Sequence, residues 1–139
     1  MEYPFESVGK ILAGKALPAK FTKSKPWWMI LSCDEGIMYH YRWQLHSSGD
    51  PALQTQRICN PIAKCHISIV RGEAPKISGL WDALVGRKVS FRYSPEVRTN
   101  GKHWWLPIEC PEIESIRAEL GLPTSKVPLH LTIGTNADS

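Results

Sequence analysis

Two short apolar runs, CHISIVR and LHLTIG, carry the same polar pattern and strongly limit how this chain can fold. Each run places a histidine and a hydroxyl residue two positions apart, His66 with Ser68 and His130 with Thr132. Runs rich in β-branched and other apolar residues are typical of strands. Residues i and i+2 of a strand lie on the same face, so each run presents an imidazole and a hydroxyl to one side and aliphatic side chains to the other.

The remaining patterns predict a mixed α+β fold with largely antiparallel sheet. From the first motif onward the expected order is strand, helix, strand, strand, helix, strand, so that a helix separates each histidine strand from a central hairpin. Expected strands cover residues 27–33, 37–45, 65–71, 88–93, 104–109 and 128–134, and expected helices cover 4–14, 76–85 and 111–120. A helix is the alternative for 37–45, the hairpin turn is predicted at 99–102, and residues 16–26 and 46–63 are expected to be loops.

Length and composition predict one soluble domain over residues 1–139. Hydrophobic residues make up 42% and charged residues 22% of the chain, which is ordinary for a globular protein. We expect no membrane span and no secretory leader, and therefore a cytoplasmic protein. The net charge of +4 is too small to indicate a duplex-DNA binder, but it suits a small anionic ligand such as a nucleotide.

The four cysteines are expected to be free thiols, and we predict no metal site and no cofactor. None of them lies in a C-x-x-C pair, which argues against zinc. Cys65 precedes His66, but neighbours on a strand point to opposite faces. A cysteine nucleophile beside this histidine is therefore disfavoured.

Two imidazoles on either side of a phosphodiester can divide the proton transfers of its cleavage. One takes the proton from the attacking oxygen and the other protonates the departing oxygen. The hydroxyls of Ser68 and Thr132 can donate to the non-bridging oxygens, where negative charge builds up. We therefore predict that His66, Ser68, His130 and Thr132 form one catalytic site. The competing interpretation is two unrelated strands, each with a satisfied histidine.

The paired motifs HISI and HLTI resemble the two signature motifs of the 2H phosphoesterase superfamily. The resemblance implies a bilobal α+β fold with helices outside a central groove, metal-independent phosphodiester chemistry, and nucleotide or RNA substrates. By motif position it implies that His66 and His130 are the acid–base pair and that Ser68 and Thr132 bind phosphate. Within the superfamily, the chain looks most like the small bacteriophage anti-CBASS enzymes, which destroy cyclic di- and trinucleotide immune signals.

Aromatic side chains are the first candidates for binding the bases of such a substrate. Each of two adjacent tryptophan pairs lies on an expected strand, so one member can pack in the core while the other lines the groove. We assign Trp28 and Trp105 to the groove, where stacking on a base is worth about 1–3 kcal/mol. Tyr39 and Tyr41 share a face if residues 37–45 form a strand. Plain core packing is the alternative for each of these residues.

Two charged residues beyond the first motif complete the predicted binding set. Arg71 lies on the opposite face from His66 by strict alternation, and a bulge would be needed to turn it inward. Glu73 lies just past the first motif, and we include it as a group that orients a ligand hydroxyl; a plain surface carboxylate is the alternative. The other histidines, His40, His46 and His103, are expected at the surface or in the core.

The sequence therefore predicts a phosphodiesterase that acts on cyclic oligonucleotides. The alternatives are a 2′,3′-cyclic nucleotide phosphodiesterase or RNA-end-processing enzyme of the same superfamily, and a non-catalytic module that sequesters nucleotides. The patterns leave open which histidine is the base, whether the nucleophile is a 2′-hydroxyl or water, and whether residues 46–63 close over a ligand.

Overall fold

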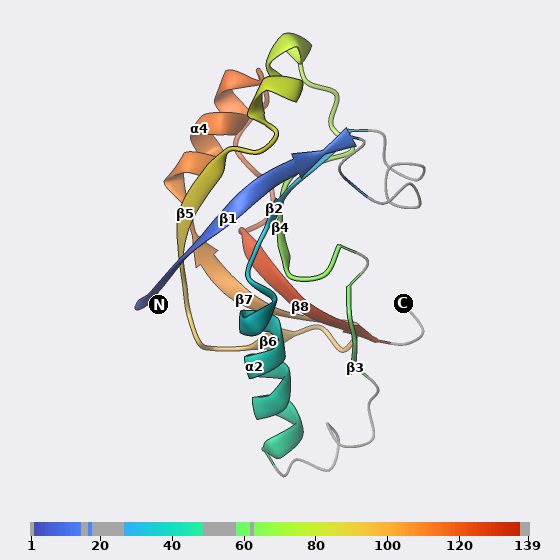
Figure 1. Cartoon of the computed structure of the whole chain (residues 1–139), viewed down its shortest axis with the longest axis vertical. Helices are drawn as coiled ribbons and strands as arrows, with labels where there is room; N and C mark the ends of the chain where they lie inside the picture. The colour runs from blue at the N-terminus through green and yellow to red at the C-terminus, as the bar shows by residue number, and fades with distance from the viewer. Residues whose placement is uncertain (1, 15–16, 18–26, 49–57, 62, 137–139) are drawn as a thin grey trace.

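A computed structural model describes residues 2–14, 17, 27–48, 58–61 and 63–136 of the chain (Figure 1). The strands are β1 (Phe5–Ala13), β2 (Trp28–Ser32), β3 (Ile58–Cys59), β4 (His66–Arg71), β5 (Lys88–Tyr93), β6 (Arg98–Thr99), β7 (His103–Glu109) and β8 (His130–Asn136). The helices are α2 (Glu35–Ser47) and α4 (Pro111–Glu119), with two short 3-10 turns, η2 (Ser78–Leu80) and η3 (Asp82–Leu84). The α+β class and the mostly antiparallel sheet are as the sequence predicts.

The described strands form one sheet that closes on itself. Its order is β3-β8-β4-β2-β1-β5-β7-β6, and an additional pairing joins β8 to β7. All of these pairings are antiparallel. Strand β8 therefore pairs with both β4 and β7, while α4 and the 3-10 turns lie at one end of the molecule and α2 at the other (Figure 1).

The first strand corrects the helix expected over residues 4–14. A helical apolar stripe over these residues would include Phe5 and Val8, but these side chains are 45% and 49% exposed. The buried positions are instead Gly9, Ile11 and Ala13, which alternate as in a strand. Gly9 allows β1 to pack closely on β2, because a Cβ at this position would lie 2.5 Å from the Leu31 side chain. Glycine disfavours a helix, and its lack of a side chain permits close packing between strands.

Helix α2 corrects the strand expected over residues 37–45, and the helical alternative is right. Asp34 caps the helix, because its side chain accepts a hydrogen bond of 2.9 Å from the Gly36 amide. Ile37, Met38 and Tyr41 are buried, a helical spacing that places them on one face. The aromatic content of this segment favoured a strand, but the cap and the spacing favour a helix.

The helix expected over residues 76–85 is two 3-10 turns instead. Only Trp81 and Leu84, three residues apart, are buried there, which suits the three-residue period of a 3-10 helix. Ile77 and Leu80 are 51% and 39% exposed, so the predicted apolar stripe is not the buried face.

The second half of the chain follows the predictions more closely. Strands β5 and β7 are confirmed, and Gly101, with φ of 89°, sits in the predicted turn before β7. Helix α4 begins at Pro111 and ends at Glu119, and the predicted stop residue Gly121, whose φ is 77°, follows the C-cap Leu120.

Much of the two expected loops lies outside the described residues. The expected loop over 46–63 is interrupted by the end of α2 and by β3, and residues 49–57 and 62 lie outside the described residues. The loop expected over 16–26 also lies outside them, except for residue 17.

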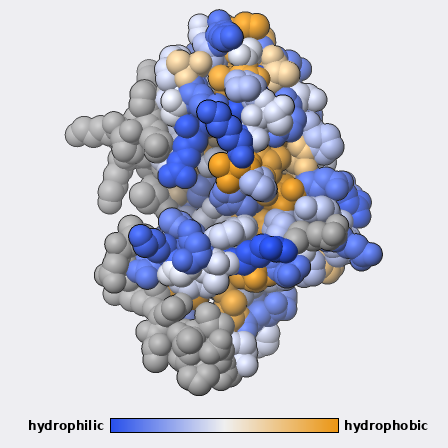
Figure 2. All heavy atoms as spheres, turned by 180° about the vertical axis from the view of Figure 1, so that it is seen from behind, coloured by the Kyte–Doolittle hydropathy of each residue, from blue (hydrophilic) through white to orange (hydrophobic). Residues whose placement is uncertain are grey.

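Buried side chains from all the long strands and from both α-helices form the main apolar core. The face shown in Figure 2 also carries a central band of apolar side chains bordered by hydrophilic groups. No described helix has the length and apolarity required to cross a bilayer.

Candidate active site

The two histidine strands are direct neighbours in the sheet. Strands β4 and β8 pair antiparallel, with His66 opposite Thr132 and Ile67 opposite Leu131. The described ladder ends with these two pairs, and Ser68 and His130 are the next residues of the two strands. His66 therefore stands across from the hydroxyl residue of the other strand, and alternation puts Ser68 on the face of His66 and His130 on the face of Thr132.

A bulge follows the hydroxyl residue in each of these strands. Met29 of β2 pairs with Val70 but Ile30 pairs with Ser68, so Ile69 is an extra residue in β4. Each bulge shifts by one residue which side chains face the polar side. Arg71 of β4 is thereby turned to the side of His66. The bulge that Arg71 needs in order to face inward lies at Ile69, two residues earlier in the strand.

Strand β8 contains a bulge of the same kind. Trp105 of β7 pairs with Thr132 while Trp104 pairs with Gly134, which leaves Ile133 as the extra residue. Thr135 is thereby turned to the side of His130, as Arg71 is in β4. The two motifs thus share a longer spacing than the sequence revealed: histidine, hydroxyl residue after two positions, and a further polar residue after three.

Residues from β4, β7 and β8 line a cavity of about 390 Å³ beside these strands. They include His66, Arg71, His130, Thr132, Thr135 and Trp105. Trp28 also lines it, so both tryptophans assigned to the groove face the cavity. The neighbour of Trp105, Trp104, is 1% exposed and belongs to the core.

The two imidazoles are held in the same way. His66 Nδ1 lies 2.8 Å from the carbonyl oxygen of Lys64, and His130 Nδ1 lies 3.1 Å from that of Pro128. A carbonyl oxygen only accepts, so each Nδ1 carries the proton when the ring is neutral, and each Nε2 carries the lone pair. Lys64 adopts φ of 55°, an unfavourable value outside glycine, and this strained residue supplies the carbonyl that orients His66.

Burial separates the electrostatics of the two histidines. His66 is 7% exposed, and this burial lowers its pKa to about 4, against the opposing effect of the Lys64 carbonyl. Electrostatic interactions with His130 and Arg71 lower the pKa of His66 further. His66 is therefore a neutral imidazole at neutral pH. His130 is half-buried at the cavity wall, with its ring centroid 6.0 Å from that of Trp105.

Trp28 connects the hydroxyl of the first motif to the arginine beyond it. Its Nε1 donates a hydrogen bond of 3.3 Å to Ser68 Oγ, and the Arg71 guanidinium lies 4.9 Å from its ring centroid. An indole under a guanidinium stabilises the cation by about 0.5–1 kcal/mol at an exposed site. The pair Trp28 and Arg71 therefore forms an ordered, positively charged side of the cavity.

Glu73 lies in a second, adjoining cavity and is engaged by Arg117, a residue that the sequence analysis missed. Arg117 donates to both carboxylate oxygens of Glu73, at 2.9 and 2.8 Å, and is 3% exposed. The hydrogen bonds from Arg117 lower the pKa of Glu73. Arg117 also donates to the carbonyl oxygen of Ile69, the bulged residue, at 2.9 Å.

The Arg117 contacts show that the predicted ligand-orienting role of Glu73 competes with a structural one. The pair fixes the bulge that turns Arg71 into the cavity. A signal was present in the sequence, because residues 113, 116, 117 and 120 form a helical stripe in which Arg117 is the only charged member. A charge in such a stripe requires a buried partner.

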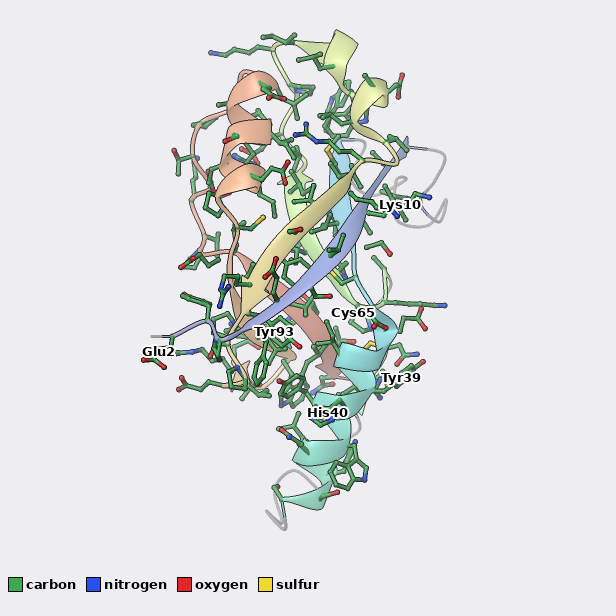
Figure 3. The ribbon with its side chains drawn as sticks, turned by 60° about the vertical axis from the view of Figure 1, so that its left-hand side comes forward. Glu2, Lys10, Tyr39, His40, Cys65 and Tyr93 are labelled. Atoms are coloured by element: carbon green, nitrogen blue, oxygen red, sulfur yellow. The ribbon has the colours of Figure 1, made fainter. Side chains whose placement is uncertain are left out.

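The two tyrosines of the predicted binding set lie elsewhere. Because residues 35–47 are helical, Tyr39 and Tyr41 do not share a face. Tyr41 is 5% exposed and packs edge-on against Tyr93, with centroids 6.3 Å apart, whereas Tyr39 is 51% exposed. Figure 3 shows Tyr39 and His40 on α2, and neither tyrosine is among the described residues that line the two cavities.

Cys65 is buried at 1% exposure, within the core and close to the start of α2 (Figure 3). Burial raises the pKa of its thiol to about 12, so a thiolate nucleophile is disfavoured there. Among the described residues, no three His, Cys, Asp or Glu side chains are grouped as metal ligands would be.

His103 is a further residue that sequence reasoning missed. It was expected at the surface or in the core, but it lines the first cavity together with Asn100. His103 lies two positions before Trp105 on β7, and therefore on the same face. That alternation was visible in the sequence.

Comparison of the chain with models of known protein families, with curated proteins and with solved structures gives no match.

Proposed function

We propose that this protein is a metal-independent phosphodiesterase in which His66 and His130 are the acid–base pair. The observation that carries the proposal is the β4–β8 pairing, which sets His66 opposite Thr132 and brings both of them and His130 to the wall of one cavity, with Ser68 in the wall of the adjoining one. Two proton-transfer groups and two hydroxyl donors in this order suit a tetrahedral phosphorus with two bridging and two non-bridging oxygens.

The difference in burial assigns the roles of the two histidines. His66 is neutral at neutral pH, so its Nε2 is the general base that takes a proton from the attacking hydroxyl, a ribose 2′-hydroxyl or water. As the new P–O bond forms, the bond to the departing oxygen breaks. His130, as the general acid, gives its Nε2 proton to that oxygen.

The remaining polar groups stabilise the charge that develops on the phosphoryl group. The hydroxyls of Ser68 and Thr132 donate to the non-bridging oxygens. The Arg71 guanidinium, which the bulge at Ile69 turns toward the cavity, supplies positive charge. Trp28 and Trp105 provide apolar walls against which a base can stack.

The proposed substrates are cyclic di- and trinucleotides, cleaved at their 3′–5′ bonds. This proposal includes membership of the 2H phosphoesterase superfamily, with its bilobal fold and central groove, and a role in bacteriophage counter-defence in the host cytoplasm. It is supported by the two motifs and by the matching bulges that follow them.

A substrate panel tests the proposal and separates it from its alternatives. The protein is incubated with cyclic dinucleotides, 2′,3′-cyclic mononucleotides and short RNA, each with and without EDTA. Turnover of cyclic dinucleotides that survives EDTA is the expected result. Turnover confined to 2′,3′-cyclic mononucleotides or RNA ends favours the other enzymes of the superfamily, and binding without turnover favours a sequestering module.

The matched control for the site is another histidine. His130→Ala should abolish turnover, while His46→Ala, at the exposed end of α2, should leave it unchanged. An active His130→Ala variant would overturn the mechanism.

A further inference from the structure

A second hollow adjoins the proposed site and is as large as the first. It measures about 410 Å³, against about 390 Å³ for the cavity that holds His66. Four residues line both cavities: Arg71, Val127, Pro128 and His130. The two cavities are therefore the two sides of one site, and the proposed general acid and the arginine stand at their junction.

The two hydroxyls of the motifs divide between these cavities. Thr132 lines the first and Ser68 lines the second. If both hydroxyls contact one phosphoryl group, that group lies at the junction, beside His130 and Arg71. Its two bridging oxygens then lead in opposite directions, one substituent into each cavity.

The chemistry of the second cavity differs from that of the first. The first has the aromatic walls of Trp28 and Trp105, whereas the second is lined by aliphatic groups such as Leu129 and by Ser125 and Lys126. The guanidinium of Arg117 in its wall is already engaged by Glu73 and by backbone carbonyls. Lys126 and Arg71 are exposed, and they supply the cationic groups of this cavity that an incoming anion can reach.

From these observations we infer that the second cavity is a subsite for the nucleotide on the far side of the scissile phosphate, with Lys126 meeting the next phosphate of the chain or ring. The inference rests on the proposed function and narrows its substrate class. Each cavity lies in the range of about 300–1,000 Å³ that is usual for small-molecule sites. The structure thus favours substrates with two linked nucleotides over a 2′,3′-cyclic mononucleotide, which fills one cavity only.

The test reverses the charge of Lys126 and uses a matched lysine as its control. Lys126→Glu is compared with Lys88→Glu, because Lys88 is also exposed but lies on β5 and lines neither cavity. Kinetics are measured on a 3′,3′-cyclic dinucleotide and on a 2′,3′-cyclic mononucleotide. We expect Lys126→Glu to raise KM for the dinucleotide at least about tenfold, and to leave the mononucleotide kinetics within about twofold of wild type.

Failure of this inference is distinguishable from failure of the proposed function. If wild type cleaves the cyclic dinucleotide and Lys126→Glu behaves like Lys88→Glu, the second subsite is wrong and the phosphodiesterase stands. If wild type cleaves neither compound, the proposed function fails. The subsite is then judged by equilibrium binding of a phosphorothioate cyclic dinucleotide, whose affinity should exceed that of the mononucleotide in wild type and lose this advantage in Lys126→Glu. Equal affinities in wild type would overturn it.

Discussion

Acidification should destabilise the folded protein through His66 in a defined pH window. Burial lowers the pKa of His66 to about 4 in the folded state, whereas an unfolded chain titrates its histidines near 6.5. Between these values the unfolded state holds more protons, so the free energy of unfolding rises with pH. The contribution is complete above about pH 6.5 and is lost as the pH falls towards 4. At pH 4.5 the loss amounts to about 2.5 kcal/mol relative to pH 7.5.

The assay is urea unfolding, followed by tryptophan fluorescence at pH 7.5 and 4.5, for wild type and His66→Gln. Glutamine stays neutral at both pH values, so carboxylates such as Glu73 affect both proteins alike and cancel in the comparison. The wild-type loss between the two pH values should exceed the loss in the variant by about 2.5 kcal/mol. Equal losses would show that His66 titrates normally in the folded state and would refute the reasoning from its burial.

Three further predictions concern the site. The acid limb of the kcat/KM profile should lie near pH 4, where His66 becomes protonated, and a limb near 6.5 would rule out this residue as the base. Ser68→Ala and Thr132→Val should each raise the barrier by about 2.7–4 kcal/mol if each hydroxyl acts as an oxyanion donor, as measured by kcat. Arg117→Met should lower the free energy of unfolding by about 1–3 kcal/mol in urea, because the partly exposed Glu73 carboxylate and the backbone carbonyls lose a buried donor. An effect under about 1 kcal/mol would contradict the role given to Arg117.

The histidine strands were predictable because polar and apolar residues alternate over the four positions of each motif. His66 with Ser68 and His130 with Thr132 lie on strands, and these strands are neighbours. The sequence could not reveal that each strand bulges after its hydroxyl residue, since an extra residue has no signature in an apolar run. The faces of Arg71 and Thr135 depend on those bulges, so strict alternation placed Arg71 on the wrong side.

The errors elsewhere came from segments in which two periodicities compete. Residues 5–13 contain an apolar spacing that suits a helix, yet Gly9 admits the Leu31 side chain only when the segment is a strand. Residues 35–47 are rich in aromatic side chains, yet Asp34 caps them as a helix. In both segments tertiary packing and capping outweighed intrinsic propensity. For the same reason, Tyr39 and Tyr41 do not share the face that a strand would have given them.

The central claim is that two imidazoles, remote in the sequence, act on one phosphorus atom. The most direct measurement is a crystal structure of the protein with a phosphorothioate cyclic dinucleotide. The account predicts that the Nε2 atoms of His66 and His130 lie about 2.6–3.2 Å from the attacking and departing oxygens of a single phosphoryl group. A phosphoryl group that contacts only one of these imidazoles, or binds away from the β4–β8 pair, would contradict it.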